Sequence, residues 1–231
     1  MPLLTPLPGG RYAPVVRFIA LLFLCAVPQE TDFKERSFKL PARHGQVFVS
    51  RDGRRAAWVA GDRVSFDGKD GPKFDDFEWL GFSPDGASIA YTARRGGKGR
   101  FVVVGAQSFG PFDRVAHPVY SQFGRHWAFA ASLKGRAFIT LDGQTLDEFD
   151  DVRAPVFSND GLLAYHAIEK GKAFLVLDGK KAEAFDSICY WPEDLFTPSG
   201  QTHAYKAVSG GKSFVVVNGK KSDAYDDVGR L

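Results

Sequence analysis

Cysteine and methionine are scarce in this sequence. Its 231 residues include two cysteines and one methionine. Cys25 falls in an apolar segment near the N-terminus, so the rest of the chain holds a single cysteine, Cys189. A fold held together by a framework of disulfides is therefore excluded, even in an oxidising compartment.

The chain also lacks a strong excess of charge of either sign. Its formal net charge is +3. Two of the positive residues, Arg11 and Arg17, lie in a segment that we expect to be removed. The remaining body is close to neutral, which gives no electrostatic basis for binding nucleic acid.

No apolar run is long enough to span a bilayer. The run Phe18–Val27 has ten residues and follows Arg11 and Arg17, as in the hydrophobic region of a signal peptide. We therefore expect residues 1–30 to be a signal peptide. The mature chain, residues 31–231, would have no membrane span and would be exported to the periplasm or the cell exterior. Two alternatives remain open, namely lipidation at Cys25 and an uncleaved N-terminal anchor.

Amphipathic helical periodicity is missing from the rest of the chain. No window after residue 30 carries an apolar stripe of 3.6-residue period long enough for a helix. The sequence is instead rich in Phe (21) and Gly (25), which favours short strands joined by tight turns. This composition predicts an all-β fold.

Four short motifs recur in the same order in five copies. They are a Ser-x-Asp-Gly turn such as Ser83–Gly86, an Ala-aromatic pair, an apolar run ending in Asp-Gly or Asn-Gly, and an aromatic-Asp pair. The aromatic residues of the second motif are Trp58, Tyr91, Phe129, Tyr165 and Tyr205. The aromatic-Asp pairs recur at intervals of 38, 37, 36 and 40 residues, beginning at Phe74, Phe112, Phe149, Phe185 and Tyr225. Such a period predicts a repeated supersecondary unit.

Each copy predicts four short strands. The strand Ala173–Leu177 is apolar at every position, which indicates that it is covered on both faces. Sheets stacked around an axis cover both faces in this way. We therefore expect a β-propeller of five four-stranded blades in a single domain, with the second-motif aromatics buried. The repeats are placed approximately at 45–80, 81–119, 120–156, 157–195 and 196–231. Segment Phe33–Leu40 is expected to pair with the last blade.

The Phe82–Gly86 motif (FSPDG), followed by the pair Ala90-Tyr91, resembles the WD40-like repeat of TolB-type bacterial propellers. The resemblance covers most of residues 45–231. It is specific for the fold and carries less information about function. What it implies is a periplasmic or secreted scaffold that binds other proteins.

The motifs of several enzyme classes are missing. Ser209–Ser213 resembles the end of a phosphate-binding loop, but Lys206 stands where the first glycine is needed and a strand is expected to follow. The sequence has no Gly-x-Ser-x-Gly nucleophile motif and no close-spaced histidine pair. We therefore predict a protein that is not an enzyme, with no catalytic residue, no metal site and no cofactor.

Binding residues are expected in Cys189–Leu195, the longest connection after an aromatic-Asp pair. Variable loops on a rigid scaffold are where binding usually resides. The candidate ligand-binding residues are Trp79, His117, Tyr190, Trp191 and Glu193. We expect them at the end of the blades that carries the Gly-Lys turns, away from the Ser-x-Asp-Gly turns. The alternative is that Trp79 and Trp191 are wedged between blades.

The pattern favours an exported, non-enzymatic scaffold that binds a protein or another envelope ligand. Aromatic side chains flanked by carboxylates suit a protein partner and also suit a sugar ring. The alternative is therefore a propeller that binds or hydrolyses polysaccharide. Two carboxylates about 5–10 Å apart and facing the propeller axis would favour the hydrolase.

Overall fold

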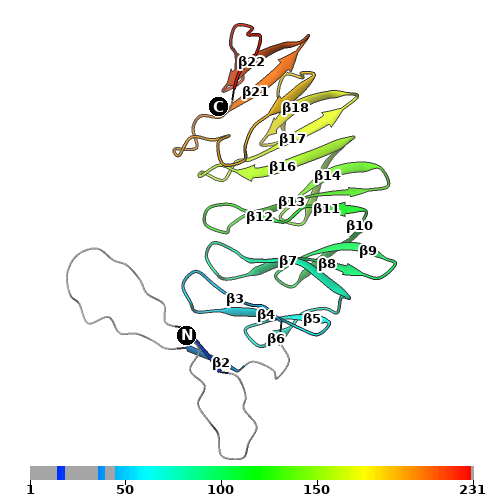
Figure 1. Cartoon of the computed structure of the whole chain (residues 1–231), viewed down its shortest axis with the longest axis vertical. Coiled ribbons are helices and arrows are strands. Elements are labelled where there is room, and N and C mark those ends of the chain that lie inside the picture. Colours follow the sequence, from blue (N-terminus) through cyan, green and yellow to red (C-terminus); the bar gives the residue numbers. More distant parts are fainter. Residues whose placement is uncertain (1–14, 19–35, 40–44, 230–231) are drawn as a thin grey trace, which may run out of the picture. The chain divides into compact units, whose positions relative to one another are not determined.

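The computed structural model describes residues 15–18, 36–39 and 45–229 (Figure 1). Residues 45–229 form strands, turns and bends with no helix, which confirms the all-β prediction. No helix among the described residues could cross a membrane. Cys25 and most of the expected signal peptide lie outside the described residues.

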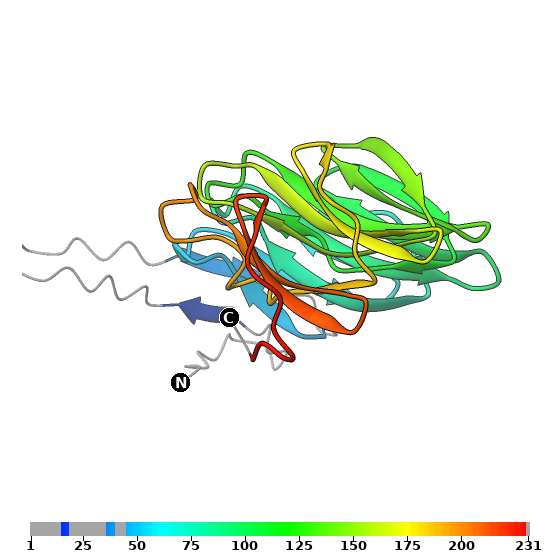
Figure 2. The ribbon, with the colours of Figure 1, turned by 90° about the horizontal axis from the view of Figure 1, so that it is seen from above.

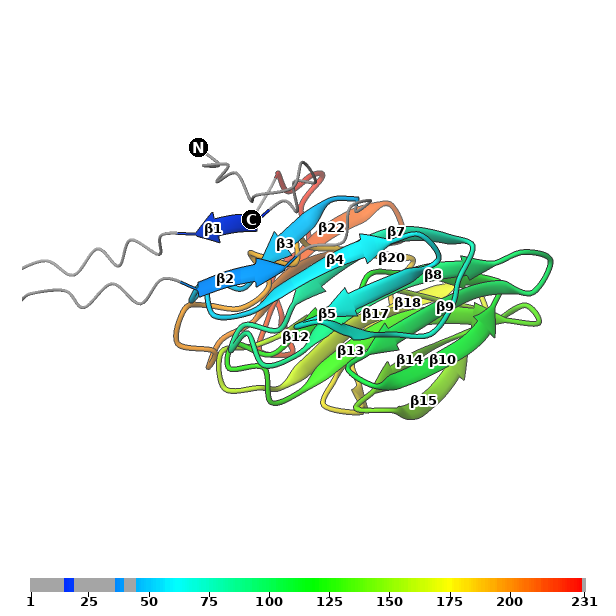
Figure 3. The same ribbon diagram turned by 90° about the horizontal axis from the view of Figure 1, so that it is seen from below.

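The chain forms two compact units, which are described separately. The first comprises residues 1–96 and 103–108, and the second comprises residues 97–102 and 109–231. Blade 1 belongs to the first unit and is an antiparallel sheet of β3 (Val47–Val49), β4 (Ala56–Ala60), β5 (Arg63–Phe66) and β6 (Lys69–Asp70). Figure 3 labels the first three of these strands. Blade 2 takes residues from both units and contains β7 (Asp76–Phe82), β8 (Ile89–Arg95), β9 (Gly99–Val104) and β10 (Gln107–Phe112).

Three further blades make up most of the second unit. In blade 3 the first strand is split in two, giving β11 (Arg114–Val115), β12 (Val119–Tyr120), β13 (Trp127–Leu133), β14 (Arg136–Leu141) and β15 (Gln144–Phe149). Blade 4 contains β16 (Asp151–Phe157), β17 (Leu163–Glu169), β18 (Lys172–Leu177) and β19 (Lys180–Lys181). Blade 5, drawn in orange and red in Figure 2, contains β20 (Ser187–Cys189), β21 (Ala204–Ser209), β22 (Lys212–Val217) and β23 (Lys220–Lys221). The five sheets are the predicted blades of a β-propeller.

The segment before blade 1 pairs differently from the expectation. Strand β2 (Arg36–Lys39) pairs antiparallel with β1 (Val15–Phe18), and not with a strand of blade 5. Strand β1 lies within the residues assigned to the signal peptide. A strand of four residues does not reveal its pairing partner by sequence alone, because pairing is set by tertiary context.

The aromatic residues of the Ala-aromatic motif are buried, as predicted. Their exposed fractions are 5% or less for Trp58, Tyr91, Phe129, Tyr165 and Tyr205. In the second unit the core lies between consecutive blades. Phe149, at the end of blade 3, packs edge-on against Tyr165 and Phe174 of blade 4, with ring centroids 6.3 and 5.7 Å apart. The aromatic repeat therefore supplies the packing between sheets.

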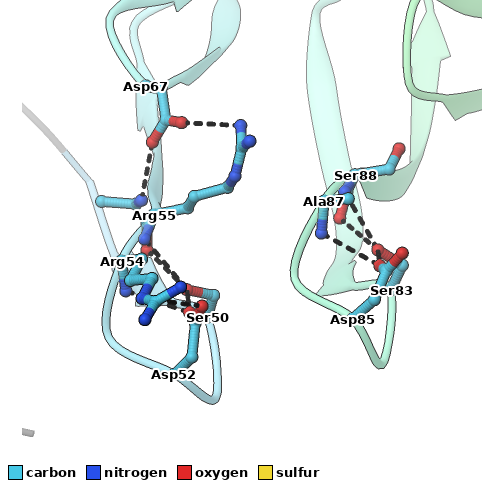
Figure 4. Close-up of polar contacts among 10 residues, drawn as sticks. Ser50, Asp52, Arg54, Arg55, Asp67, Ser83, Asp85, Ala87 and Ser88 are labelled. Carbon is cyan, nitrogen blue, oxygen red and sulfur yellow. Dashed lines mark hydrogen bonds and ion pairs between the residues drawn. The ribbon is translucent and has the colours of Figure 1, made fainter. Parts of the chain in front are cut away.

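The Ser-x-Asp-Gly motif forms the turn between the first two strands of a blade (Figure 4). The Ser83 hydroxyl donates to Asp85 Oδ1 at 2.6 Å and accepts from the Ser88 amide at 3.0 Å. Ser50 makes the same two bonds, with Asp52 and the Arg55 amide. The Ser83 hydroxyl bond lowers the pKa of Asp85. These bonds are side-chain turn chemistry, so the motif has a structural role.

The aspartate of the aromatic-Asp motif joins one blade to the next. Its carboxylate accepts a hydrogen bond from a backbone amide in the next Gly-Lys turn. In the second unit the distances are 2.7 Å from Lys134 N to Asp113, 2.7 Å from Lys170 N to Asp150 and 2.8 Å from Gly210 N to Asp186. Each of these blades therefore begins just after an aromatic-Asp motif. The repeats predicted from the sequence begin instead near a Ser-x-Asp-Gly turn.

Replacing Asp150 by alanine is expected to lower the free energy of unfolding by roughly 1–2 kcal/mol, because the Lys170 amide loses a charged acceptor. Asp226→Ala is the matched control. Asp226 is the corresponding residue of the fifth copy and is followed by no further blade among the described residues. It pairs with Lys212 at 2.6 Å through a side chain that is 95% exposed. Urea unfolding should show little change for this control. Equal effects of the two variants would contradict the structural role of Asp150.

The buried tyrosines predict a loss of stability at alkaline pH. Burial raises the pKa of Tyr91, Tyr165 and Tyr205 to about 12, whereas a tyrosine in an unfolded chain ionises near pH 10, roughly. Between these values the unfolded chain binds fewer protons than the folded chain, so the free energy of unfolding falls as pH rises.

Replacing the three tyrosines by phenylalanine should flatten this fall in urea unfolding measured between about pH 9 and 11.5. The hydroxyls of Tyr91 and Tyr205 are buried and have no hydrogen-bond partner among the described residues, so the replacements leave none of these residues unpaired at the two sites. An unchanged slope with pH in the triple variant would show that these hydroxyls do not cause the alkaline sensitivity.

Candidate functional site

The first strand is interrupted in blades 2 to 5. Pairing shifts register between Phe77 and Trp79 in blade 2 and between Arg153 and Val156 in blade 4. In blade 3 the strand breaks at residues 116–118, and in blade 5 the interruption extends over most of Cys189–Leu195. Interruptions of this kind turn side chains out of the regular pleat and are common beside binding sites. Trp79, His117, Tyr190, Trp191 and Glu193 all lie at them.

Segment 189–195 is anchored at two points. Leu195 is 1% exposed and packs in the core with Ile188 and Tyr205. The Tyr190 hydroxyl donates to the carbonyl oxygen of Ala154 in blade 4 at 3.0 Å, and burial raises the pKa of Tyr190. These two contacts tie the segment to blade 4 and to the core.

Between these anchors the chain makes a tight turn that presents Trp191. The amides of Asp194 and Leu195 both donate to the Trp191 carbonyl oxygen, at 2.9 and 3.1 Å. The Trp191 side chain remains 52% exposed. A residue wedged between blades would be buried, so this exposure argues against the wedge alternative for Trp191.

A groove of about 630 Å³ runs along one side of this turn. One wall is Pro192–Asp194. Val156–Asn159 of blade 4 and Phe196–Pro198 complete the lining. The Asn159 side-chain amide donates to the Pro198 carbonyl oxygen and ties the two turns together. We call this the 192–198 groove. Among the described residues, Glu193 and Asp194 are its only charged lining residues.

A much smaller hollow, of about 40 Å³, also borders segment 189–195. Tyr190, Trp191 and Lys206 contribute to its lining, together with Cys189, whose thiol is free and exposed. Lys206 Nζ is held 2.6 Å from Asp227. The hollow is too small for more than a single side chain or water-sized group.

The prediction that segment 189–195 lies at the end of the blades that carries the Gly-Lys turns is wrong. The 192–198 groove is lined by Ser158 and Thr197, which begin two Ser-x-Asp-Gly turns. The Gly-Lys turns lie at the other end of β17 and β21, where Asp150 and Asp186 bind them. The physical reason is that β20 directly follows Phe185-Asp186, so segment 189–195 comes at the far end of that strand.

The structure brings together only some of the five predicted ligand-binding residues. Trp191 and Tyr190 line the small hollow, and Glu193 lines the groove. His117 is exposed between β11 and β12 and lines neither. Trp79, in the first unit, is half-buried over Gly81, where an added side-chain carbon would lie 2.6 Å from the indole ring.

Sequence reasoning missed the residues that the neighbouring turns contribute to the groove. Phe157, Asn159 and Phe196 line the groove, and none of them is among the predicted ligand-binding residues. The signal that could have identified them is the Ser-x-Asp-Gly motif, since consecutive copies place equivalent turns side by side. Among the described residues, no group of three or more His, Cys, Asp or Glu side chains could hold a metal ion.

Comparison with known proteins supports the fold. No protein-family model and no curated protein matches the chain. A eukaryotic initiation factor structure matches at 12% identity and a TM-score of 0.52, over 83% of this chain and 56% of the other. The chain therefore spans little more than half of that structure.

Two further structures match over similar lengths. The β-propeller domain of Swd1 from Myceliophteria thermophila matches at 13% identity and a TM-score of 0.39, over 83% of this chain and 76% of that one. TolB from Acinetobacter baumannii matches at 15% identity and a TM-score of 0.40, over 84% and 61%. Identities this low concern the fold and not the function.

Proposed function

We propose that this chain, a β-propeller of WD40-like repeats, is an exported, non-enzymatic scaffold that binds a protein ligand through the 192–198 groove and Trp191. The observation that carries the proposal is a half-exposed tryptophan, held by a tight turn, beside a groove of about 630 Å³. Tryptophan is among the residues most often found at the energetic centre of protein interfaces.

The anchoring of segment 189–195 supports binding without a large ordering cost. Leu195 is buried in the core and the Tyr190 hydroxyl is bonded to Ala154. A loop that is already ordered loses little conformational entropy when a ligand binds, so more of the contact energy remains as affinity. The groove can therefore act as a preformed site.

The polar groups of the groove are engaged in turn chemistry, which favours binding over catalysis. Ser158 is 1% exposed and its hydroxyl donates to Asp160. The Thr197 hydroxyl lies 3.0 Å from the Ser199 hydroxyl. The remaining charged groups, Glu193 and Asp194, are consecutive in the chain and do not face each other from opposite walls, as the carboxylates of a glycosidase do.

Export rests on the sequence. Arg11 and Arg17 precede the ten-residue apolar run Phe18–Val27, the order found in signal peptides. A nearly neutral body agrees with a role that involves neither nucleic acid nor a charged membrane surface. The ligand would then be a component of the cell envelope or its surroundings.

Site-specific photo-crosslinking tests this proposal. A photoreactive phenylalanine analogue is placed at Glu193, in the groove, and in a second protein at Phe123, which is 64% exposed and not in the groove lining. After irradiation in an envelope extract, the Glu193 protein should give a discrete protein adduct that the Phe123 protein does not give.

Identical adducts from both positions, or none from either, would contradict a specific site in the groove. An adduct that glycosidases digest and proteases do not would replace the protein ligand by a polysaccharide. Mass spectrometry of the adduct distinguishes these outcomes.

A further inference from the structure

A second cleft lies in the second unit, apart from the 192–198 groove. It has a volume of about 330 Å³ and is lined by residues of β11, β13 and β14 in blade 3 and of β16 in blade 4. Its charged lining residues are Arg114, Asp151 and Arg153. None of its residues lines the 192–198 groove. We call it the 114–153 cleft.

Two guanidinium groups share one carboxylate at this cleft. Arg153 Nε lies 2.7 Å from Asp151 Oδ2, and Arg114 Nη2 lies 3.6 Å from Asp151 Oδ1. Arg114 Nε also donates to the Ser132 hydroxyl at 3.2 Å. The charged lining therefore carries two positive charges and one negative charge, which leaves a net positive charge.

The guanidinium groups keep donors for a ligand. Among the described residues, Arg153 contacts an acceptor only through Nε, so its two Nη groups are unused. The Arg153 and Arg114 side chains are 63% and 70% exposed, whereas that of Asp151 is 22% exposed. A guanidinium group whose donors are arranged as a fork matches the two oxygens of a carboxylate.

The Ser132 hydroxyl also lines the cleft and already accepts from Arg114, while the rest of the lining is small and apolar. Ala130, Ala131 and Ala137 are nearly completely buried, and Ala116 lines the exposed side. The volume is at the lower limit of small-molecule sites, which start near roughly 300 Å³. A ligand that fits must therefore be small, with a short apolar body.

We propose that the 114–153 cleft binds a small monocarboxylic acid. Its carboxylate would be bound by Arg153 and Arg114, and its short apolar chain would lie against the alanines. A single negative charge balances the net positive charge of the lining. Asp151 is a positioning residue that holds the two guanidinium groups at the same side of the cleft.

Butyrate is the probe for this site. The full-length protein is labelled with ¹⁵N, and the Nε–H signals of its arginines are followed as butyrate is added. Two compounds of similar size serve as controls: butylamine carries a positive charge, and 1-butanol carries no charge. Butyrate should shift the signals of Arg153 and Arg114 in a saturable way, and the two controls should not. Equal shifts with 1-butanol or butylamine would overturn the proposal.

Three variants locate the site. Arg153→Gln should weaken butyrate binding about tenfold or more, since it removes a charged hydrogen-bond donor. Arg136→Gln is the control: Arg136 pairs with Asp150 and Glu169 outside the cleft, and its loss should leave butyrate binding unchanged. Ala116→Leu fills the exposed side without changing charge and should also weaken binding. Binding that survives Ala116→Leu, or that falls equally in Arg136→Gln, would show that no defined cleft is involved.

Discussion

Replacing Phe129 by alanine is expected to lower the free energy of unfolding by about 3–5 kcal/mol. Phe129 is fully buried, and its ring lies 5.8 Å from that of Phe109, 5.9 Å from that of Phe112 and 6.0 Å from that of Trp127. Removing it deletes apolar contacts and leaves a cavity that rings held by strands on either side cannot fill. Urea unfolding followed by tryptophan fluorescence measures the change.

Phe123→Ala is the matched control. Phe123 is the same residue type six positions earlier in blade 3, but its side chain is 64% exposed. Its truncation should change the free energy of unfolding by less than about 0.5 kcal/mol. Similar losses from the two variants would show that the Ala-aromatic motif does not mark the core.

The blade core could be predicted because each copy of the repeat constrains the others. Tyr165 alone could be a surface residue, but Trp58, Tyr91, Phe129 and Tyr205 occupy the same place in their own copies. Burial is then the environment that suits all five, and the structure confirms it. The Asp-Gly turns could be predicted because their conformation depends on the two turn residues themselves. Asp178 and Gly179 have φ values of 48° and 74°, the left-handed conformation of a two-residue hairpin turn.

The side of the molecule that bears segment 189–195 could not be predicted in this way. Its position depends on where the first strand of blade 5 begins, and the sequence does not mark that point. Strand β20 starts one residue after Asp186, which carries the segment to the opposite end of the blade. The groove wall formed by Phe157 and Asn159 depends on contacts between blades, which no local motif encodes.

The aromatic residue of the last aromatic-Asp motif is exposed, unlike its buried counterparts in earlier copies. Phe74, Phe149 and Phe185 are 1% exposed, whereas Tyr225, the last aromatic of the same motif, is 49% exposed. The earlier aromatics are covered by packing against the blade that follows. In the part of the chain that the structure describes, no blade follows Tyr225. Its motif is therefore the same while its environment differs.

Replacing Trp191 by alanine is expected to weaken binding of the protein identified by crosslinking at least about tenfold, as truncation of an interface tryptophan commonly does. Stability should change little, because the side chain is 52% exposed before the ligand binds. The melting temperature should stay within about 2 °C of the wild-type value.

Leu195→Ala is the control for this variant in the same segment. Leu195 is 1% exposed, so its truncation should lower the melting temperature clearly, with a loss of about 2–5 kcal/mol in the free energy of unfolding. The two variants separate residues that hold segment 189–195 in place from the residue that it presents. A large stability loss in both would mean that Trp191 also has a packing role.

The most direct measurement is a binding isotherm for Trp191→Ala, recorded with a thermal melt of the same sample. The scaffold proposal predicts a dissociation constant raised at least about tenfold with an unchanged melting temperature. A variant that melts several degrees lower and binds with wild-type affinity once folded would contradict it, because Trp191 would then serve the fold and not the site.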